Sequence, residues 1–182
     1  MSKALFLDRD GIINIDHGYV HKIEDFEFVD GIFELCKRAI DKGYQIFVIT
    51  NQAGIARGMY DIPTFEKLSK WMVAAFAEQN IEISKVYFCP HHPLKGVNEF
   101  VMSCQCRKPE PGMIIQAQQE FGVNLAKSIL IGDKISDMQA ADNAGIDCKI
   151  LMNSRYVDEQ VAEQIAGTIE IQSLTEALAY VI

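Results

Sequence analysis

Short apolar segments alternate with amphipathic segments along nearly the whole chain, and this alternation limits the possible folds more than any other feature. Candidate strands occur at residues 3–7, 44–49, 85–88, 128–131 and 148–152. Between the first two, apolar residues such as Ile32, Leu35 and Ala39 share one helical face. A repeated strand–helix order predicts one parallel sheet with helices on both faces, joined by right-handed crossovers.

The remaining segments are divided between further helices and three irregular stretches. We expect additional helices around residues 65–76, 114–121, 138–144 and 173–182. Pro111 opens one of them and Gly145 ends another, as is usual at helix termini. The irregular stretches cover residues 14–30, 51–62 and 89–111. The last is longer than an ordinary loop and therefore needs a function or a staple.

Size and composition fit a single domain over residues 1–182. Such a length suits one domain, and an apolar fraction of 49% can fill one core. No run approaches the roughly 20 apolar residues of a membrane span, and the first apolar run is too short for a signal peptide. We therefore expect a cytoplasmic monomer without a membrane partner. The formal net charge of −8 argues against a nucleic-acid partner.

Three polar residues that could take part in catalysis or bind a metal stand directly after strands, namely Asp8, Thr50 and Asp133. Carboxyl ends of parallel strands meet at one edge of a sheet, where open α/β folds bind ligands. Asp10 follows Asp8 by two positions, and two close carboxylates repel unless a cation holds them ionised. Mg²⁺ prefers oxygen ligands. The sequence therefore predicts a magnesium site of Asp8, Asp10 and Asp133, with Asp137 in support.

The pair of carboxylates also suggests a reaction. One carboxylate can attack phosphorus as a nucleophile, and the other can protonate a leaving alkoxide and later deprotonate water. We assign the first role to Asp8 and the second to Asp10. A solvated acidic turn is the alternative for this pair alone, and the matching positions of Thr50 and Asp133 argue against it.

These residues resemble the haloacid-dehalogenase (HAD) superfamily of aspartate-nucleophile phosphatases. Its four motifs match Asp8-Arg9-Asp10-Gly11, Thr50, Lys108, and Gly132-Asp133 with Asp137. The resemblance implies a three-layer Rossmann-like fold without a large cap domain. It also implies that Thr50 and Lys108 bind the transferring phosphoryl group and that Lys134 supports the site. Ile12 replaces the usual threonine, from which we expect a change in local packing and no loss of chemistry.

The longest irregular stretch contains a cluster of cysteine and histidine residues. Cys89 and His91 form one close pair, and Cys104 and Cys106 form another. Two such pairs fit tetrahedral Zn²⁺, and in a cytosolic chain this spacing favours metal over disulfides. Because all four positions come from the protein, we expect a structural zinc that staples the loop. His92 is the competing histidine, and the resemblance favours His91.

Within the superfamily, the zinc ligands narrow the resemblance to two phosphatase groups, one for a heptose 1,7-bisphosphate and one for histidinol phosphate. Residues 16–20, 50–58, 89–93 and 106–109 resemble the heptose group. This resemblance implies a pocket shaped by Asp16-His17-Gly18-Tyr19 and Asn51-Gln52-Ala53, with Arg107 on the remaining phosphate. Ala53 departs from the usual small polar residue. The implied role is removal of the phosphate on carbon 7 during heptose supply for cell-surface polysaccharide.

Three alternatives remain open from the sequence. Histidinol phosphate could be the substrate of the same chemistry. An aspartyl-phosphate could also pass its phosphoryl group to an alcohol in place of water. The alternative of another class is a non-catalytic, zinc-stapled binding module, and the intact set of Asp8, Asp10, Lys108 and Asp133 argues against it.

Overall fold

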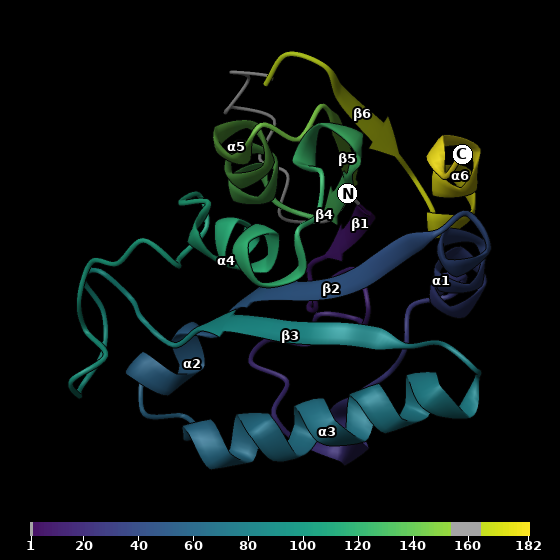
Figure 1. Cartoon of the computed structure of the whole chain (residues 1–182). Coiled ribbons are helices and arrows are strands. Elements are labelled where there is room, and N and C mark those ends of the chain that lie inside the picture. The colour runs from purple at the N-terminus through teal and green to yellow at the C-terminus, as the bar shows by residue number, and fades with distance from the viewer. Residues whose placement is uncertain (1, 154–164) are drawn as a thin grey trace.

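The computed structural model describes residues 2–153 and 165–182 and contains one parallel sheet of six strands (Figure 1). The strands are β1 (Lys3–Leu7), β2 (Tyr44–Asn51), β3 (Ile83–Cys89), β4 (Ile129–Gly132), β5 (Cys148–Met152) and β6 (Thr168–Ile171). Their spatial order is β3-β2-β1-β4-β5-β6, and every neighbouring pair is parallel. The parallel sheet predicted from the sequence is thus confirmed. The edge strand β6 was not predicted, because its four residues are too short for a clear period.

Within the described residues, six α-helices connect or cover the strands. They are α1 (Ile32–Asp41), α2 (Ala53–Ala56), α3 (Ile62–Glu78), α4 (Gly112–Phe121), α5 (Ile135–Ala144) and α6 (Leu174–Ala177). The helix expected over residues 173–182 was wrong in extent, because α6 ends at Ala177 and a 3₁₀ turn follows at Leu178–Tyr180. The chain leaves the helical path to bury Val181, whose carbonyl accepts a bond from Arg38 Nε at 3.3 Å.

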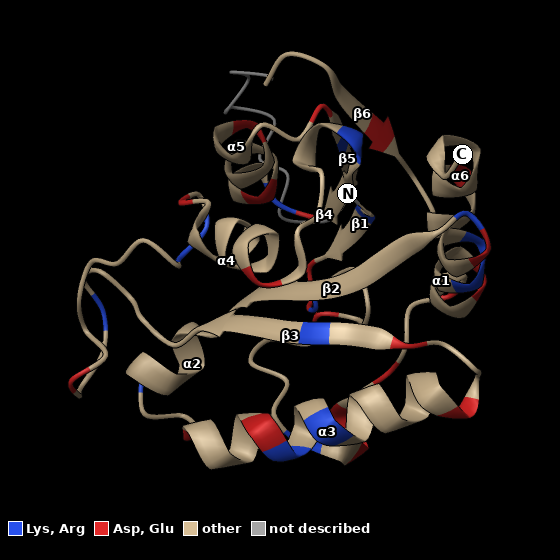
Figure 2. Ribbon diagram, viewed as in Figure 1, with Lys and Arg blue, Asp and Glu red and all other residues tan. Residues whose placement is uncertain are grey.

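Alternate residues of the strands supply two separate cores, one on each face of the sheet. In β1, Leu5 and Leu7 pack with α1, α3 and α6, whereas Ala4 and Phe6 pack with α4 and α5. This period of two is what a strand buried on both faces requires. Figure 1 shows the resulting three layers, and Figure 2 shows that β2 carries no charged residue. The expected three-layer HAD-type fold is confirmed.

The long helix α3 illustrates how local signals set these layers. Asp61 caps its first turn by accepting the Thr64 N–H at 2.9 Å. Phe65, Met72 and Phe76 then recur at helical spacing and are buried. Met72 and Phe76 join the core on this face of the sheet, and the Phe65 ring contacts Phe88 of β3. The connection that leads into α3 is consequently fixed in direction, and this connection carries one wall of the pocket described below.

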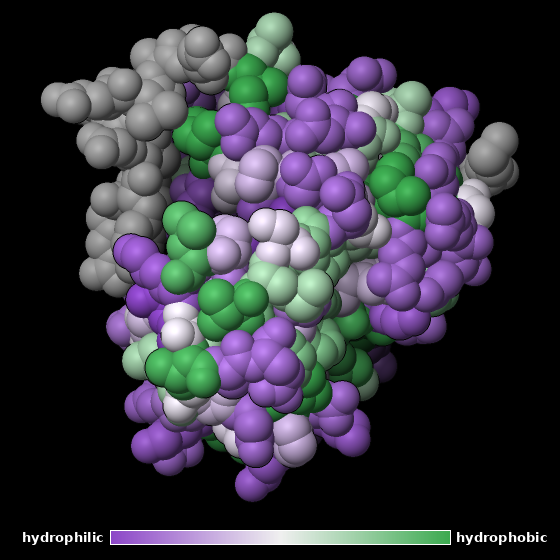
Figure 3. Space-filling model, turned by 90° about the vertical axis from the view of Figure 1, so that its left-hand side faces the viewer, coloured by the Kyte–Doolittle hydropathy of each residue, from purple (hydrophilic) through white to green (hydrophobic). Residues whose placement is uncertain are grey.

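The strand order reverses between β1 and β4, which are neighbours in the sheet although α1, α3 and α4 separate them in sequence. Such a switch point opens a crevice at the carboxyl ends of the strands. Residues 8–31, 52–61 and 90–111 all leave the sheet at this end, and the last two of these segments lie on the left in Figure 1. Figure 3 views the molecule from this side and shows apolar surface among hydrophilic side chains. The loops and the strand ends together build the candidate site.

All strands of the described residues belong to this one sheet. The domain expected over residues 1–182 also includes residue 1 and residues 154–164, which lie outside the described part. Within the described part, the helices are too short or too polar to cross a membrane.

Candidate active site

Asp8 follows β1 directly and begins a tight turn. Its backbone N–H donates to the Ile131 carbonyl at 3.0 Å, so the sheet itself fixes this residue. Three later backbone N–H groups, of residues 12 to 14, donate to the Arg9 carbonyl and close the turn. Gly11 has a φ of 94°, and a Cβ at that position would collide with the Asp133 carboxylate. Glycine is therefore required there for both its backbone angle and its size.

Lys108 brings a buried positive charge to Asp8 from the loop after β3. Its Nζ lies 2.9 Å from Asp8 Oδ1 and 2.6 Å from Asp137 Oδ1, and it donates to the Ile49 carbonyl at 2.9 Å. Burial lowers the pKa of Lys108, but the two carboxylates outweigh it and raise the pKa above its ordinary value. The Asn51 amide holds the Lys108 backbone, accepting its N–H at 3.0 Å and donating to its carbonyl at 3.1 Å.

Asp8, Asp133 and Asp137 form a group of three buried carboxylates whose oxygen atoms lie within 4.8 Å of one another. Asp133 directly follows β4, and Asp137 lies in the first turn of α5. Burial raises the pKa of both Asp8 and Asp133, the nearby Lys108 does not reverse this rise, and neighbouring carboxylates add to it. A divalent cation would relieve the repulsion, and a donor set made only of oxygen fits Mg²⁺.

The Asp10 carboxylate stands apart from this group because three other side chains hold it. Its Oδ1 accepts from Arg9 Nη2 at 2.8 Å and from Asn14 Nδ2 at 3.1 Å, and its Oδ2 accepts from Gln52 Nε2 at 3.1 Å. Arg9 is only 1% exposed and also donates to the Val20 carbonyl at 2.7 Å. The sequence interpretation gave Asp10 both a metal-binding and an acid/base role. In this placement the Asp10 carboxylate lies outside the group of three, and both roles stay predictions.

Thr50 and Gln52 are both buried at the end of β2. Gln52 Nε2 donates to Thr50 Oγ1 at 2.8 Å, so one amide contacts both Thr50 and Asp10. Ala53 begins the short helix α2 and is partly buried. The segment predicted to shape the substrate pocket thus includes Asn51 and Gln52, which also hold Lys108 and Asp10 in place.

The turn at residues 16–19 lies beside the three carboxylates. Asp16 Oδ1 accepts the Gly18 N–H at 2.9 Å, which closes the turn. Lys134 Nζ lies 3.7 Å from Asp16 Oδ2 and 3.7 Å from Asp133 Oδ1, and so connects the turn to the end of β4. The predicted supporting residue Lys134 and the predicted pocket residue Asp16 are therefore brought together.

The other two residues of this turn, His17 and Tyr19, contact Glu27 and Arg57. His17 is half-exposed, with its Nε2 3.5 Å from Glu27 Oε2. Tyr19 has a positive φ of 52°, uncommon for a residue with a side chain, and its ring lies 5.6 Å from the Arg57 guanidinium carbon. A cation and an aromatic ring thus stand at the rim of the site.

The ligand atoms of Cys89, His91, Cys104 and Cys106 also lie within 4.8 Å of one another. The three sulfur–sulfur distances are 3.1, 3.4 and 3.5 Å, and no disulfide joins them. His91 Nδ1 lies 3.5 Å from Cys89 Sγ and 3.4 Å from Cys106 Sγ. A tetrahedron with Zn–S bonds of about 2.3 Å has edges of about 3.8 Å, so the four groups are close to a zinc arrangement.

Two neighbours of the cluster clarify the sequence interpretation. His92 Nδ1 accepts the backbone N–H groups of Leu94 and Lys95 at 3.1 and 2.9 Å, and His92 does not belong to the cluster. Arg107 Nη1 donates to the His91 carbonyl at 3.0 Å. Arg107, which was predicted to bind a phosphate, is therefore hydrogen-bonded to the backbone of a residue of the cluster.

Sequence reasoning missed three residues that support the site, namely Arg9, Asn14 and Tyr60. Arg9 stands between two acids in the sequence, and this was the only available signal for its burial and pairing. Asn14 and Tyr60 gave no signal, since their partners become apparent only when the loops are folded. Tyr60 donates from its hydroxyl to Gln52 Oε1 at 2.6 Å.

Comparison with known proteins gives consistent similarities. The HAD-hydrolase-like family model matches residues 105–177. The chain is 48% identical over 151 residues to the D-glycero-beta-D-manno-heptose-1,7-bisphosphate 7-phosphatase of Yersinia pestis, covering 83% of this chain and 80% of that protein. It is 50% identical over 170 residues to the D-glycero-alpha-D-manno-heptose-1,7-bisphosphate 7-phosphatase of Campylobacter jejuni, covering 93% and 94%.

A solved structure shows the same architecture. The D,D-heptose 1,7-bisphosphate phosphatase from B. bronchiseptica, crystallised with magnesium and phosphate, superimposes with a TM-score of 0.83 at 29% identity. The match covers 98% of this chain and 97% of that chain. The fold, and not only the sequence motifs, is therefore shared with that enzyme.

Proposed function

The chain belongs to the HAD-like hydrolases, within the heptose-1,7-bisphosphate 7-phosphatases, and on this premise we propose that it removes the phosphate on carbon 7 of a heptose 1,7-bisphosphate. The product would be the heptose 1-phosphate. The similarity to named heptose phosphatases over most of the chain carries this proposal. The gathering of Asp8, Lys108 and Asp10 at one edge of the sheet supports its chemistry.

The proposed reaction has two halves. A carboxylate oxygen of Asp8 attacks phosphorus, and the bond between phosphorus and the oxygen on carbon 7 breaks while Asp10 donates a proton to that leaving oxygen. Asp10 then accepts a proton from water, whose oxygen attacks phosphorus. The bond between Asp8 and phosphorus breaks, which releases phosphate. Thr50 and the Lys108 ammonium stabilise the charge on the transferring group.

The group of three carboxylates supports a magnesium site. Asp8 and Asp133 would hold the ion, as predicted from the sequence, and the position of Asp137 suits either direct binding or support through Lys108. When bound, Mg²⁺ supplies positive charge that neutralises the phosphoryl oxygens. Asp10 would serve mainly through its proton, since Arg9, Asn14 and Gln52 already hold its carboxylate.

The cluster of Cys89, His91, Cys104 and Cys106 supports a structural zinc. All four positions are filled by protein side chains, so the site has no opening for substrate. Because Lys108 follows Cys106 by two positions, the ion would shorten the free part of the loop that carries Lys108. It would thereby help hold the lysine beside Asp8.

Recognition of the sugar is proposed for the segments at the rim. Asp16 and Tyr19 would contact the heptose on one side, with Ala53 on another, and Arg107 would bind the phosphate on carbon 1. A planar guanidinium suits this because it can pair with two phosphate oxygens.

A substrate panel tests the proposal directly. Phosphate release is measured with magnesium on the alpha and beta anomers of heptose 1,7-bisphosphate and on histidinol phosphate. We expect turnover of a heptose bisphosphate to be fastest, with phosphorus NMR showing that the phosphate on carbon 1 survives. Faster turnover of histidinol phosphate would contradict the substrate assignment, and no release from any compound would contradict phosphatase activity itself.

A further inference from the structure

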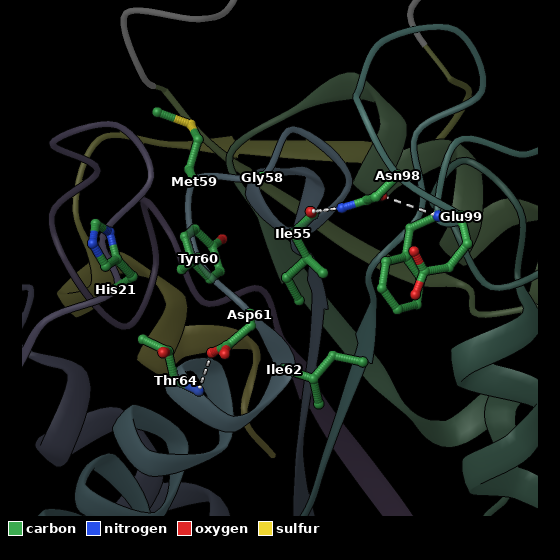
Figure 4. A pocket seen from close by; sticks show the side chains of 11 residues that line it. His21, Ile55, Gly58, Met59, Tyr60, Asp61, Ile62, Thr64, Asn98 and Glu99 are labelled. Atoms are coloured by element: carbon green, nitrogen blue, oxygen red, sulfur yellow. Dashed lines mark hydrogen bonds between the residues drawn. The ribbon is translucent and has the colours of Figure 1, made fainter.

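Tyr60 lies in the wall of a pocket of about 550 Å³ between the α2–α3 connection and the loop after β3 (Figure 4). Its ring stacks on His21, with centroids 5.0 Å apart and planes inclined by 10°. The same ring covers Gly54, where an added Cβ would collide with it. These two contacts fix the direction in which the Tyr60 hydroxyl points.

The Tyr60 hydroxyl bonds to Gln52, with its oxygen 2.6 Å from Gln52 Oε1. Burial raises the pKa of Tyr60 above its ordinary value, so the hydroxyl keeps its proton. It therefore donates a hydrogen bond to the amide oxygen. Gln52 is only 1% exposed, and the Tyr60 hydroxyl is the donor that its amide oxygen meets inside the protein. The amide oxygen is therefore held toward Tyr60, and the amide nitrogen must face the opposite way.

The amide nitrogen of Gln52 carries two N–H donors, and both are used at the reaction centre. One donates to Asp10 Oδ2 at 3.1 Å and the other to Thr50 Oγ1 at 2.8 Å. If the amide turned over, its oxygen would face the Asp10 carboxylate, which repels it. One buried amide thus depends on Tyr60 for its orientation and holds two of the groups assigned to the reaction.

We propose that Tyr60 is a positioning residue, which fixes the Gln52 amide so that Asp10 and Thr50 stay in the geometry needed for phosphoryl transfer. The inference rests on the proposed phosphatase function and extends it to a residue outside the superfamily motifs. Tyr60 acts through Gln52, so its loss should affect the chemical steps more than the binding of substrate.

The first test compares Tyr60→Phe with Tyr87→Phe in the full-length, metal-loaded protein. Tyr87 is a suitable control because it is 4% exposed and its hydroxyl donates to Glu120 Oε2 at 2.8 Å, away from the assigned groups. With the best substrate of the panel, we expect Tyr60→Phe to lower kcat about tenfold and to change KM by less than about twofold. Tyr87→Phe should leave both constants unchanged, and melting temperatures show that both variants fold.

The second test is a double-mutant cycle with Gln52→Met, which keeps the approximate shape of the side chain and removes its amide. If Tyr60 acts through Gln52, adding Tyr60→Phe to Gln52→Met should lower kcat by less than about twofold further. A purely structural role for Tyr60 would instead give the same loss in both backgrounds.

The outcomes separate this inference from the function on which it rests. A drop in kcat for Tyr60→Phe that disappears in the Gln52→Met background supports the positioning role. Full activity of Tyr60→Phe, a change confined to KM, or equal losses in both backgrounds would overturn it. An inactive wild-type protein would instead refute the proposed phosphatase function.

Discussion

The carboxylate group and the thiol cluster lie at the same end of the sheet, yet different parts of the structure hold them. Asp8 and Asp133 directly follow neighbouring strands, and the Asp8 backbone continues the sheet by donating to Ile131. Cys104 and Cys106 lie in a loop without regular structure and are only partly buried. Their close contacts in the cluster are with one another, Cys89 and His91.

From this difference we expect the thiol cluster, more than the carboxylate group, to need its metal for its shape. Backbone hydrogen bonds and two packed cores hold the carboxylates, so their arrangement should outlast removal of magnesium. Cys89 ends β3 and is buried in a core, but Cys104 and Cys106 only pack against that core from an irregular loop. A loop of this length has a high closure entropy unless something ties it. Lys108 links the two regions, because it belongs to the loop and its charge is buried beside Asp8.

The largest effect is expected at the carboxylate group, from Asp8→Asn. The amide has nearly the same shape but cannot act as the nucleophile, so turnover should fall by about 10⁴-fold or more while the melting temperature changes little. Phosphate release and thermal unfolding measure the two quantities. Asp142→Asn, on the exposed side of α5, serves as the control. Substantial remaining activity would rule out Asp8 as the nucleophile.

A smaller effect is expected at the link between the regions, from Lys108→Met. Loss of the ammonium removes stabilisation of the transferring phosphoryl group, which should reduce kcat by about 10²- to 10³-fold. The control is Lys149→Met. Lys149 is also buried, but it lies in β5 and its Nζ pairs with Asp142 at 2.6 Å. Equal activity of the two variants would show that the charge of Lys108 has no part in catalysis.

Breaking the thiol cluster should have a moderate effect. Cys104→Ser should abolish the binding of about one zinc per chain, lower the melting temperature and reduce activity by about 10- to 100-fold through the displaced Lys108. Elemental analysis, thermal unfolding and phosphate release follow the three changes. The control is Cys36→Ala, which removes a buried thiol of α1 outside the cluster. This variant should still bind about one zinc per chain. A zinc-free wild-type protein with full activity would remove the staple hypothesis.

The smallest effect is expected on the edge strand β3, from Lys85→Met. Lys85 Nζ lies 2.6 Å from Glu120 Oε2, but its side chain is 41% exposed. Exposed ion pairs contribute about 0–1 kcal/mol, so stability should change within that range and activity should stay the same. Thermal unfolding at low and high salt tests this. A larger loss of stability would mean that Lys85 supports β3 and, through it, the loop that follows Cys89.

Much of the fold could be predicted from the sequence because it depends on local periodicity. Strand–helix alternation predicted a parallel sheet, and the general rule for carboxyl ends of strands placed Asp8, Thr50 and Asp133 together. The spacing of Cys89, His91, Cys104 and Cys106 predicted a metal cluster before any fold was known. The short strand β6 and the true end of α6 could not be predicted, since both depend on distant packing partners.

The sheet and the chemical groups at its carboxyl edge follow from patterns within short segments of the sequence. The orientation of those groups depends on contacts between segments that are far apart in the chain. A buried donor bonds to acceptors that the folded chain brings near it, and Nη2 of Arg9 donates to Asp10 Oδ1 and to the Val20 carbonyl. In the same way, the folded chain brings Tyr60 to Gln52, and through it to Asp10, across turns that no local pattern describes.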